Sequence, residues 1–138
     1  MRSLGAEETV DQRIRVVIVD DHALVAESVS SVLALDPTIE VVAIESTGSE
    51  GVARIQAELP DVIVLDFQLP DMTGADVAAA AHSHSPNSRI VGITASDIPG
   101  SYDAAVAAGF SAWVMKSQAV QELRDAIHRV HAGETLVD

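Results

Sequence analysis

The chain has 138 residues, of which 48% are hydrophobic and only 3% aromatic, and it carries a formal net charge of −13. This length predicts one domain with a sizeable core, the apolar content excludes a disordered chain, and the lack of cysteine excludes disulfide and thiol chemistry. The negative charge argues against direct binding of nucleic acid, because a phosphate backbone would be repelled and no stripe of basic residues is present.

Residues 1–12 are polar, acidic and without periodicity, which predicts a flexible leader. The start of the chain, MRSLGAEETVDQR, lacks the apolar core of a signal peptide, and no apolar run approaches the length that spans a membrane. We therefore expect a soluble, cytoplasmic protein without membrane contact.

Short apolar runs then alternate with longer segments of helical spacing. Strands are predicted over residues 14–19, 40–44, 62–65, 89–94 and 112–115, because continuous runs rich in Val and Ile are typical of strands covered on both faces. Between and after them, apolar residues recur at helical spacing, as in Val52, Ile55 and Leu59 and in Val120, Leu123, Ile127 and Val130.

Capping and breaking residues predict the helix boundaries. Thr47 followed by Glu50 resembles a capping box, and Thr73 followed by Asp76 is a weaker form of it. The first, second and last helices are expected to end at Pro37, Pro60 and Gly133.

Five strands alternating with five helices predict an α/β fold, in which a parallel, doubly wound sheet has helices on both faces. We assign residues 13–133 to this domain and residues 134–138 to the start of a linker. In such folds ligands bind beyond the carboxyl ends of the strands, which directs the search for function to the residues that follow each strand.

Charged and polar residues follow four of the predicted strands. Asp20 and Asp21 end the first strand, Asp66 the third, Thr94 the fourth, and Lys116, the only lysine of the chain, the fifth. Three carboxylates at one edge repel one another, which favours a hard divalent cation with oxygen ligands, Mg²⁺ (or Mn²⁺), and a neighbouring ammonium. A single Asp at a strand end is usually a turn former or helix cap, so the prediction depends on the complete set.

None of the five histidines is assigned to the metal. His22 follows the acidic pair and could touch the site, but a solvated position at a helix start is favoured. His82 and His84 are two residues apart and do not share a helix face. His128 and His131 lie near a predicted helix end, where a partly charged imidazole suits the helix dipole.

The runs VVIVDDH, VIVLDFQLPDMTG, GITAS and SAWVMKS together resemble the receiver domain of bacterial two-component response regulators. The resemblance covers about residues 14–133. It implies a flavodoxin-like (CheY-like) fold with strand order 2-1-3-4-5. The ending QELRDAIHRVHAGETLVD resembles the NarL/FixJ (LuxR-type) subfamily, whose members normally continue into a helix-turn-helix DNA-binding domain. We expect that domain to be absent from this chain.

The resemblance also implies roles for individual residues. Asp66 would accept a phosphoryl group from a phosphohistidine of a sensor histidine kinase. Asp21 would hold Mg²⁺ directly and Asp20 through water, with Asp66 and the backbone carbonyl of Gln68 as further ligands. Lys116 would pair with the acceptor carboxylate. Aspartate is already a nucleophile, so the transfer needs placement and charge neutralisation rather than a base.

Three further roles follow from the resemblance. Thr94 matches the switch hydroxyl that bonds the phosphoryl group, and Gln68 and Ser96 match positions that tune dephosphorylation. The aromatic switch position, usually Tyr or Phe, is Trp113 in this chain. Its larger indole either tucks inward behind Thr94 or packs at the sheet edge.

The predicted function is a phosphorylation-activated receiver that forms a homodimer and controls transcription through a separate DNA-binding domain. A flavodoxin-type cofactor site is disfavoured, because the acidic pair after the first strand would repel a phosphate. Turnover of outside substrates is disfavoured too, because Gln68 stands where haloacid-dehalogenase-like enzymes carry a second Asp. A receiver-like interaction module that is never phosphorylated and a stand-alone receiver remain as alternatives.

Overall fold

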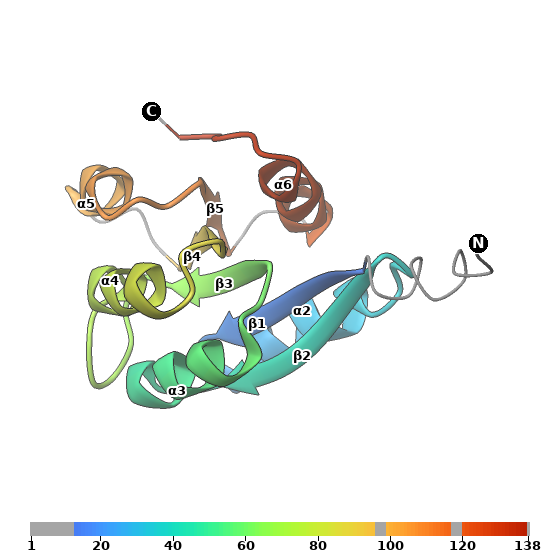
Figure 1. The fold of residues 1–138 in the computed structure, drawn as a ribbon, viewed down its shortest axis with the longest axis horizontal. Helices are drawn as coiled ribbons and strands as arrows, with labels where there is room; N and C mark the ends of the chain where they lie inside the picture. The colour runs from blue at the N-terminus through green and yellow to red at the C-terminus, as the bar shows by residue number, and fades with distance from the viewer. Residues whose placement is uncertain (1–12, 96–98, 117–119, 138) are drawn as a thin grey trace.

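The computed structural model describes residues 13–95, 99–116 and 120–137. These residues form one parallel sheet in the order β2-β1-β3-β4-β5, with helices on both faces (Figure 1). In chain order the elements are β1 (Ile14–Val19), α2 (Ala23–Leu33), β2 (Ile39–Glu45), α3 (Gly48–Glu58), β3 (Val62–Asp66), α4 (Gly74–His84), β4 (Arg89–Thr94), α5 (Ser101–Ala107), β5 (Ala112–Met115) and α6 (Val120–His131). The predicted fold and strand order are confirmed.

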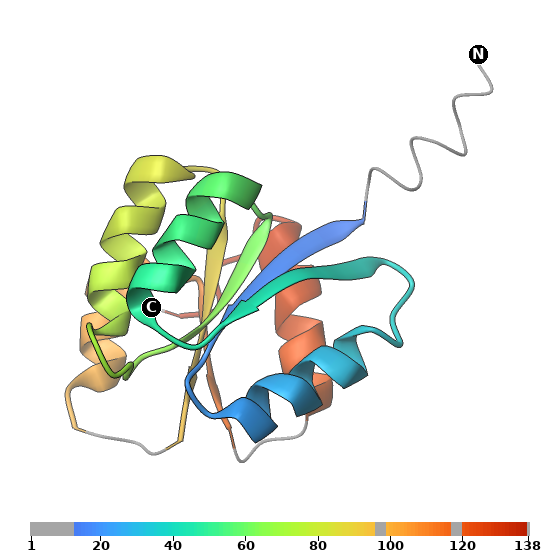
Figure 2. The ribbon, with the colours of Figure 1, turned by 90° about the horizontal axis from the view of Figure 1, so that it is seen from below.

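The strands read as continuous apolar runs because both sheet faces are buried. Along β1, Val16 and Ile18 face one helical layer, and Val17 and Val19 face the other, and all four are fully buried. Figure 2 shows α2 and α6 on one side of the sheet and α3, α4 and α5 on the other. The predicted strands 14–19, 89–94 and 112–115 match the structure, whereas β2 is longer at both ends and β3 includes Asp66.

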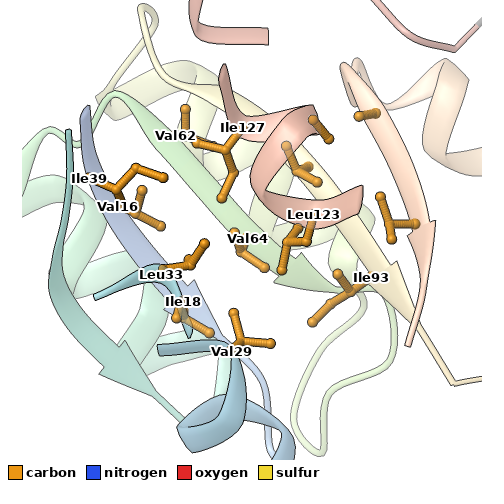
Figure 3. Packing of buried hydrophobic residues seen from close by; sticks show 14 of the residues in the cluster. Val16, Ile18, Val29, Leu33, Ile39, Val62, Val64, Ile93, Leu123 and Ile127 are labelled. Atoms are coloured by element: carbon orange, nitrogen blue, oxygen red, sulfur yellow. The ribbon is translucent and has the colours of Figure 1, made fainter. Parts of the chain in front are cut away.

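Each face of the sheet has its own core. The core under α2 and α6 is filled by aliphatic side chains from both helices and from all five strands, as Figure 3 shows for Leu33, Val64 and Ile127. The opposite core is formed by Ile55 of α3, small residues of α4 and α5, and Phe110. On α4, Val77, Ala78 and Ala81 are buried and face this core, whereas Ala79 is exposed.

The helix boundaries confirm some predictions and correct others. Thr73 and Asp76, the pair expected to be weaker, form a complete capping box, while Thr47 caps α3 by accepting a hydrogen bond from the Glu50 N–H. The prediction for Leu59 was wrong: it ends α3 in a left-handed conformation (φ 47°), and its side chain is 56% exposed instead of sharing the buried face of the helix.

The last helix ends close to Gly133, where the sequence analysis expected it to stop. Gly133 follows α6 with φ +103°, a conformation that glycine adopts without strain. The chain then returns to the sheet, because the Leu136 N–H donates to the Ser111 carbonyl over 2.7 Å and the Leu136 side chain packs on the core. The predicted leader, residues 1–12, lies outside the described residues.

None of the helices in the described part of the chain has the length and apolar character that crossing a bilayer requires.

Candidate functional site

The structure brings the predicted carboxylates together at the carboxyl end of the sheet. β1 and β3 are neighbours, so Asp20 and Asp21 lie beside Asp66. One ligand atom from each of these three residues and from His22 lies within 4.8 Å of all the others. Asp20 and Asp66 are buried, whereas Asp21 and His22 are exposed. The cluster therefore has buried anions on its inner side and an opening to solvent.

Lys116 reaches this cluster from the end of β5, and its side chain is only 8% exposed. Its ammonium donates to Oδ1 of Asp20 over 3.0 Å and to Oδ2 of Asp66 over 2.9 Å. Its backbone N–H donates to the Thr94 carbonyl over 2.7 Å, which fixes the end of β5 against β4. The only lysine of the sequence is thus held between two buried carboxylates.

Asp66 lies in an environment that disfavours its charged form. Burial raises the pKa of Asp66, against the opposing effects of the Gln68 N–H and of Lys116, and the nearby Asp20 raises it further. The Gln68 N–H donates to Oδ1 of Asp66 over 3.0 Å. One ammonium is therefore too little positive charge for the carboxylates gathered here, and a further cation would stabilise them.

The carboxylate of Asp20 provides a test of whether a metal ion fits. Its Oδ1 accepts from the backbone N–H of His22 and from Lys116, whereas its Oδ2 is buried and has no hydrogen-bond partner among the described residues. A buried carboxylate oxygen without a partner is unfavourable, and a bound cation would satisfy it. Because the carboxylates of Asp20, Asp21 and Asp66 offer the oxygen ligands that hard divalent ions prefer, these residues could hold a metal.

The segment after β3 is held by a contact that the sequence did not predict. The carboxylate of Asp71 accepts from the N–H groups of Gly48 and Ser49, over 2.7 and 3.0 Å, at the start of α3. These hydrogen bonds, the one from Gly48 first, lower the pKa of Asp71. Within the same segment Gln68 is exposed and pairs with Thr73 in an isolated bridge. The loop that carries Gln68 is thereby anchored to α3.

Thr94 lies where the sequence placed it, buried at the end of β4 and one residue beyond Ile93, the strand partner of Asp66. Its role as a switch stays a prediction. Ser96 lies outside the described residues, so its predicted role is untested too.

Trp113 is half-buried on β5 and packs edge-on against other rings. Its ring centroid is 5.4 Å from that of Phe67, 6.1 Å from Phe110 and 6.5 Å from Tyr102. Gly92, its partner on β4, makes room for the indole, since a Cβ there would come within 2.7 Å of the Trp113 ring. The indole therefore packs over a glycine of the neighbouring strand.

His22 combines the solvated helix-start position that the sequence analysis favoured with the contact to the site that it left open. The residue does occupy the N-cap position of α2, and its side chain is 56% exposed, but its Nδ1 lies 2.7 Å from the ammonium of Lys116. The same atom is 3.3 Å from Asp20 and 3.7 Å from Asp66. Its place directly after the acidic pair was the signal in the sequence, but periodicity does not show where a side chain at a helix start points.

Known relatives of this chain are response regulators. The DNA-binding transcriptional activator DevR/DosR of Mycobacterium tuberculosis is 34% identical over 125 residues, which cover 91% of this chain and 58% of that protein. The response regulator protein VraR of Staphylococcus aureus is 27% identical over 125 residues, which cover 91% of this chain and 60% of VraR. This chain thus spans less than two thirds of the length of these curated relatives.

Solved structures agree with these relatives. The signal receiver domain of NarL from Mycobacterium tuberculosis superimposes with a TM-score of 0.84 at 34% identity, covering 89% of this chain and 99% of that chain. A LuxR-family two-component response regulator from an Aurantimonas species gives a TM-score of 0.83 at 28% identity, covering 89% and 88%. The sequence model of the response regulator receiver domain matches residues 16–128. With this match over most of its length, the chain belongs to the response regulator receiver domain family, and its relatives are of the NarL/LuxR type.

Proposed function

We propose that this chain is a phosphorylation-controlled switch in which Asp66 accepts a phosphoryl group from a phosphohistidine of a sensor histidine kinase. One observation carries the proposal. The buried carboxylate of Asp66 lies at a strand end, 2.9 Å from the ammonium of Lys116 and beside Asp20, whose buried Oδ2 has no partner within the part of the chain that the structure describes. Membership of the receiver family supports the same assignment.

In the proposed step, a carboxylate oxygen of Asp66 attacks the phosphorus of the phosphohistidine. An O–P bond forms as the P–N bond breaks, and the electron pair of that bond returns to the imidazole of the kinase. The carboxylate needs no general base, because it is already ionised when it attacks. Lys116 balances the charge on the phosphoryl oxygens, and the Gln68 N–H holds the orientation of the carboxylate.

Mg²⁺ (or Mn²⁺) is the proposed cofactor, and when bound it neutralises charge on the phosphoryl oxygens. Asp20, Asp21 and Asp66 would hold it with the backbone carbonyl of Gln68. The Oδ2 of Asp20, without a partner among the residues described, supports this ligand set, and so does the exposure of Asp21, which leaves the site open to water and to the donor.

The proposed output begins with the phosphoryl group, which adds roughly two negative charges to the site. Thr94 and Trp113 would respond to these charges, and Gln68 and Ser96 would tune how long they persist. We propose that the response is formation or rearrangement of a homodimer, and that a DNA-binding domain outside this chain then controls transcription. DevR/DosR, named a DNA-binding transcriptional activator, supports this assignment. The phosphoryl transfer would occur in the cytoplasm, and the chain would not turn over other substrates.

The test is the intact mass of the protein after incubation with acetyl phosphate and Mg²⁺. We expect the wild type to gain one phosphoryl group, and we expect Asp66→Asn and an EDTA-treated sample to gain none. Asp103→Asn, which removes an exposed carboxylate from α5, is the matched control and should gain the same mass as the wild type. A folded wild type that gains no mass would contradict the proposal and favour a receiver-like interaction module that is never phosphorylated.

A further inference from the structure

We propose that His22 is a positioning residue for phosphoryl transfer, because its imidazole accepts a hydrogen bond from Lys116 and holds the ammonium between Asp20 and Asp66. The inference rests on the proposed function, since it assigns a further residue to that site. It concerns a side chain that would act through its contact with Lys116.

The contacts of Lys116 carry the inference. An ammonium has three N–H donors. Among the described residues, the Lys116 ammonium has three partners, namely Oδ1 of Asp20 at 3.0 Å, Oδ2 of Asp66 at 2.9 Å and Nδ1 of His22 at 2.7 Å. The contact with His22 is the shortest. Without this contact, one N–H of the Lys116 ammonium would lose its acceptor among the described residues. Only the two carboxylates would then hold the ammonium.

The backbone places His22 for this contact independently of its ring. The His22 N–H donates to Oδ1 of Asp20 over 2.9 Å, and its carbonyl accepts from the Ala26 N–H over 3.0 Å as α2 begins. The side chain makes no capping hydrogen bond to the helix. Its removal should therefore leave α2 intact, and the ring is available for Lys116.

The chemistry of an imidazole suits this position. An ammonium can only donate, so a ring nitrogen 2.7 Å away would receive its N–H through a lone pair. An imidazole that accepts in this way brings no negative charge to the ammonium. A further carboxylate in the same place would compete with Asp66 for that charge and would increase the repulsion among the anions. His22 thus fixes Lys116 while its positive charge stays available for Asp66 and the incoming phosphoryl group.

The test compares rates of phosphorylation by acetyl phosphate at saturating Mg²⁺, followed by intact mass. We expect His22→Ala to slow the reaction about tenfold, the effect of losing one hydrogen bond to a charged group. His22→Asn should recover most of the rate, because an amide oxygen can accept in place of Nδ1. His84→Ala is the matched control, since it removes an exposed histidine from the end of α4 and should react at the wild-type rate.

A second readout separates positioning from a general structural effect. Because the chain has one lysine, protein labelled with ¹⁵N and ¹³C in lysine gives NMR signals from Lys116 alone. We expect the side-chain signals to shift and the ammonium protons to exchange faster in His22→Ala, and both to return towards wild type in His22→Asn. Equal rates for His22→Ala and wild type would overturn the inference, and so would a slow His22→Ala with wild-type lysine signals.

Failure of the proposed function has a different signature. If the wild type itself gains no phosphoryl group, the proposed function is wrong, and so is the role of His22 in phosphoryl transfer. The lysine signals would still show whether His22 holds Lys116.

Discussion

Among the residues of the site, Asp66 is only 3% exposed and contacts Lys116, and burial raises its pKa against the opposing effects of Gln68 and Lys116. A raised pKa means that the ionised carboxylate is less favourable in the folded protein than in the unfolded chain. The charge required for nucleophilic attack therefore lowers the stability of the domain, unless a metal ion is bound.

Asp66→Asn should accordingly raise the free energy of unfolding in the absence of metal, by about 1 kcal/mol at neutral pH. The sign follows from linkage. Above the folded pKa the carboxylate is ionised in both states and its unfavourable contribution is complete, and as the pH falls through that pKa the folded protein takes up the proton first. The gain should therefore shrink as the pH approaches 3.8, the ordinary value for aspartate. Urea unfolding of both proteins in EDTA at several pH values measures this difference in the free energy of unfolding. An Asp66→Asn variant that is less stable than wild type at neutral pH would contradict the expectation.

The sequence could predict most residues of this site but not all of their contacts. Asp20, Asp66, Thr94 and Lys116 were found because carboxyl ends of parallel strands must meet at one edge. The Asp71 carboxylate caps the N–H groups of Gly48 and Ser49, more than twenty residues earlier, and such a pairing exists only once the two loops are folded side by side.

At the scale of elements, α4 begins directly after the loop that carries Gln68, and its capping box determines where that loop stops. The Thr73 side chain accepts from the Asp76 N–H over 3.1 Å, and the Asp76 carboxylate accepts from the Thr73 N–H over 3.2 Å. The two hydrogen bonds satisfy donors that the first turn of a helix leaves free.

Thr73→Ala should lower the free energy of unfolding by about 1 kcal/mol, because it removes the hydroxyl that caps α4. Thr73→Ser keeps that hydroxyl and should stay close to wild type. Urea unfolding at neutral pH measures both variants. Equal losses for Ala and Ser would show that the methyl group of Thr73, rather than its cap, is what stabilises the domain.

Strands were predicted to within one residue and the ends of α3 and α6 to within two, whereas the end of α2 was not. The strand signal is strong because both faces of the sheet are buried. α2 already ends at Leu33, before the expected stop at Pro37, because Asp36 turns the chain by accepting from the N–H and the hydroxyl of Thr38. Pro37 marked the turn, but the side-chain hydrogen bonds that form it begin one residue earlier.

At the scale of the whole molecule, periodicity predicted a doubly wound sheet, but the order of its strands came from the family resemblance. Alternating strands and helices are compatible with more than one order, and contacts between distant segments do not show in a local pattern. One such contact joins the turn after α2 to the last helix. Oδ2 of Asp36 lies 2.9 Å from Nε2 of His128 on α6, and Arg124 lies 3.9 Å away on the same helix. The first and last helices are thereby linked on one face of the sheet.

The contact between Asp36 and His128 leads to a prediction about the pH dependence of stability. The hydrogen bond from His128, followed by those from Thr38, holds the pKa of Asp36 well below its usual range. A lowered pKa in the folded state means that the ionised carboxylate stabilises the domain at every pH above 3.8. Below that value the unfolded chain takes up a proton that the folded protein does not, so this contribution is lost as the pH falls.

Asp36→Asn keeps the shape of the side chain and removes its charge, so it should lower the free energy of unfolding by about 1 kcal/mol at neutral pH. The difference from wild type should shrink as the pH falls below 3.8, where the stability of the wild type itself declines. Urea unfolding at a series of pH values measures both curves. Glu27→Gln, which neutralises an exposed carboxylate on α2, is the control and should follow the wild type throughout. A difference between Asp36→Asn and wild type that stays constant with pH would overturn this prediction, because such a difference could not come from the ionisation of Asp36.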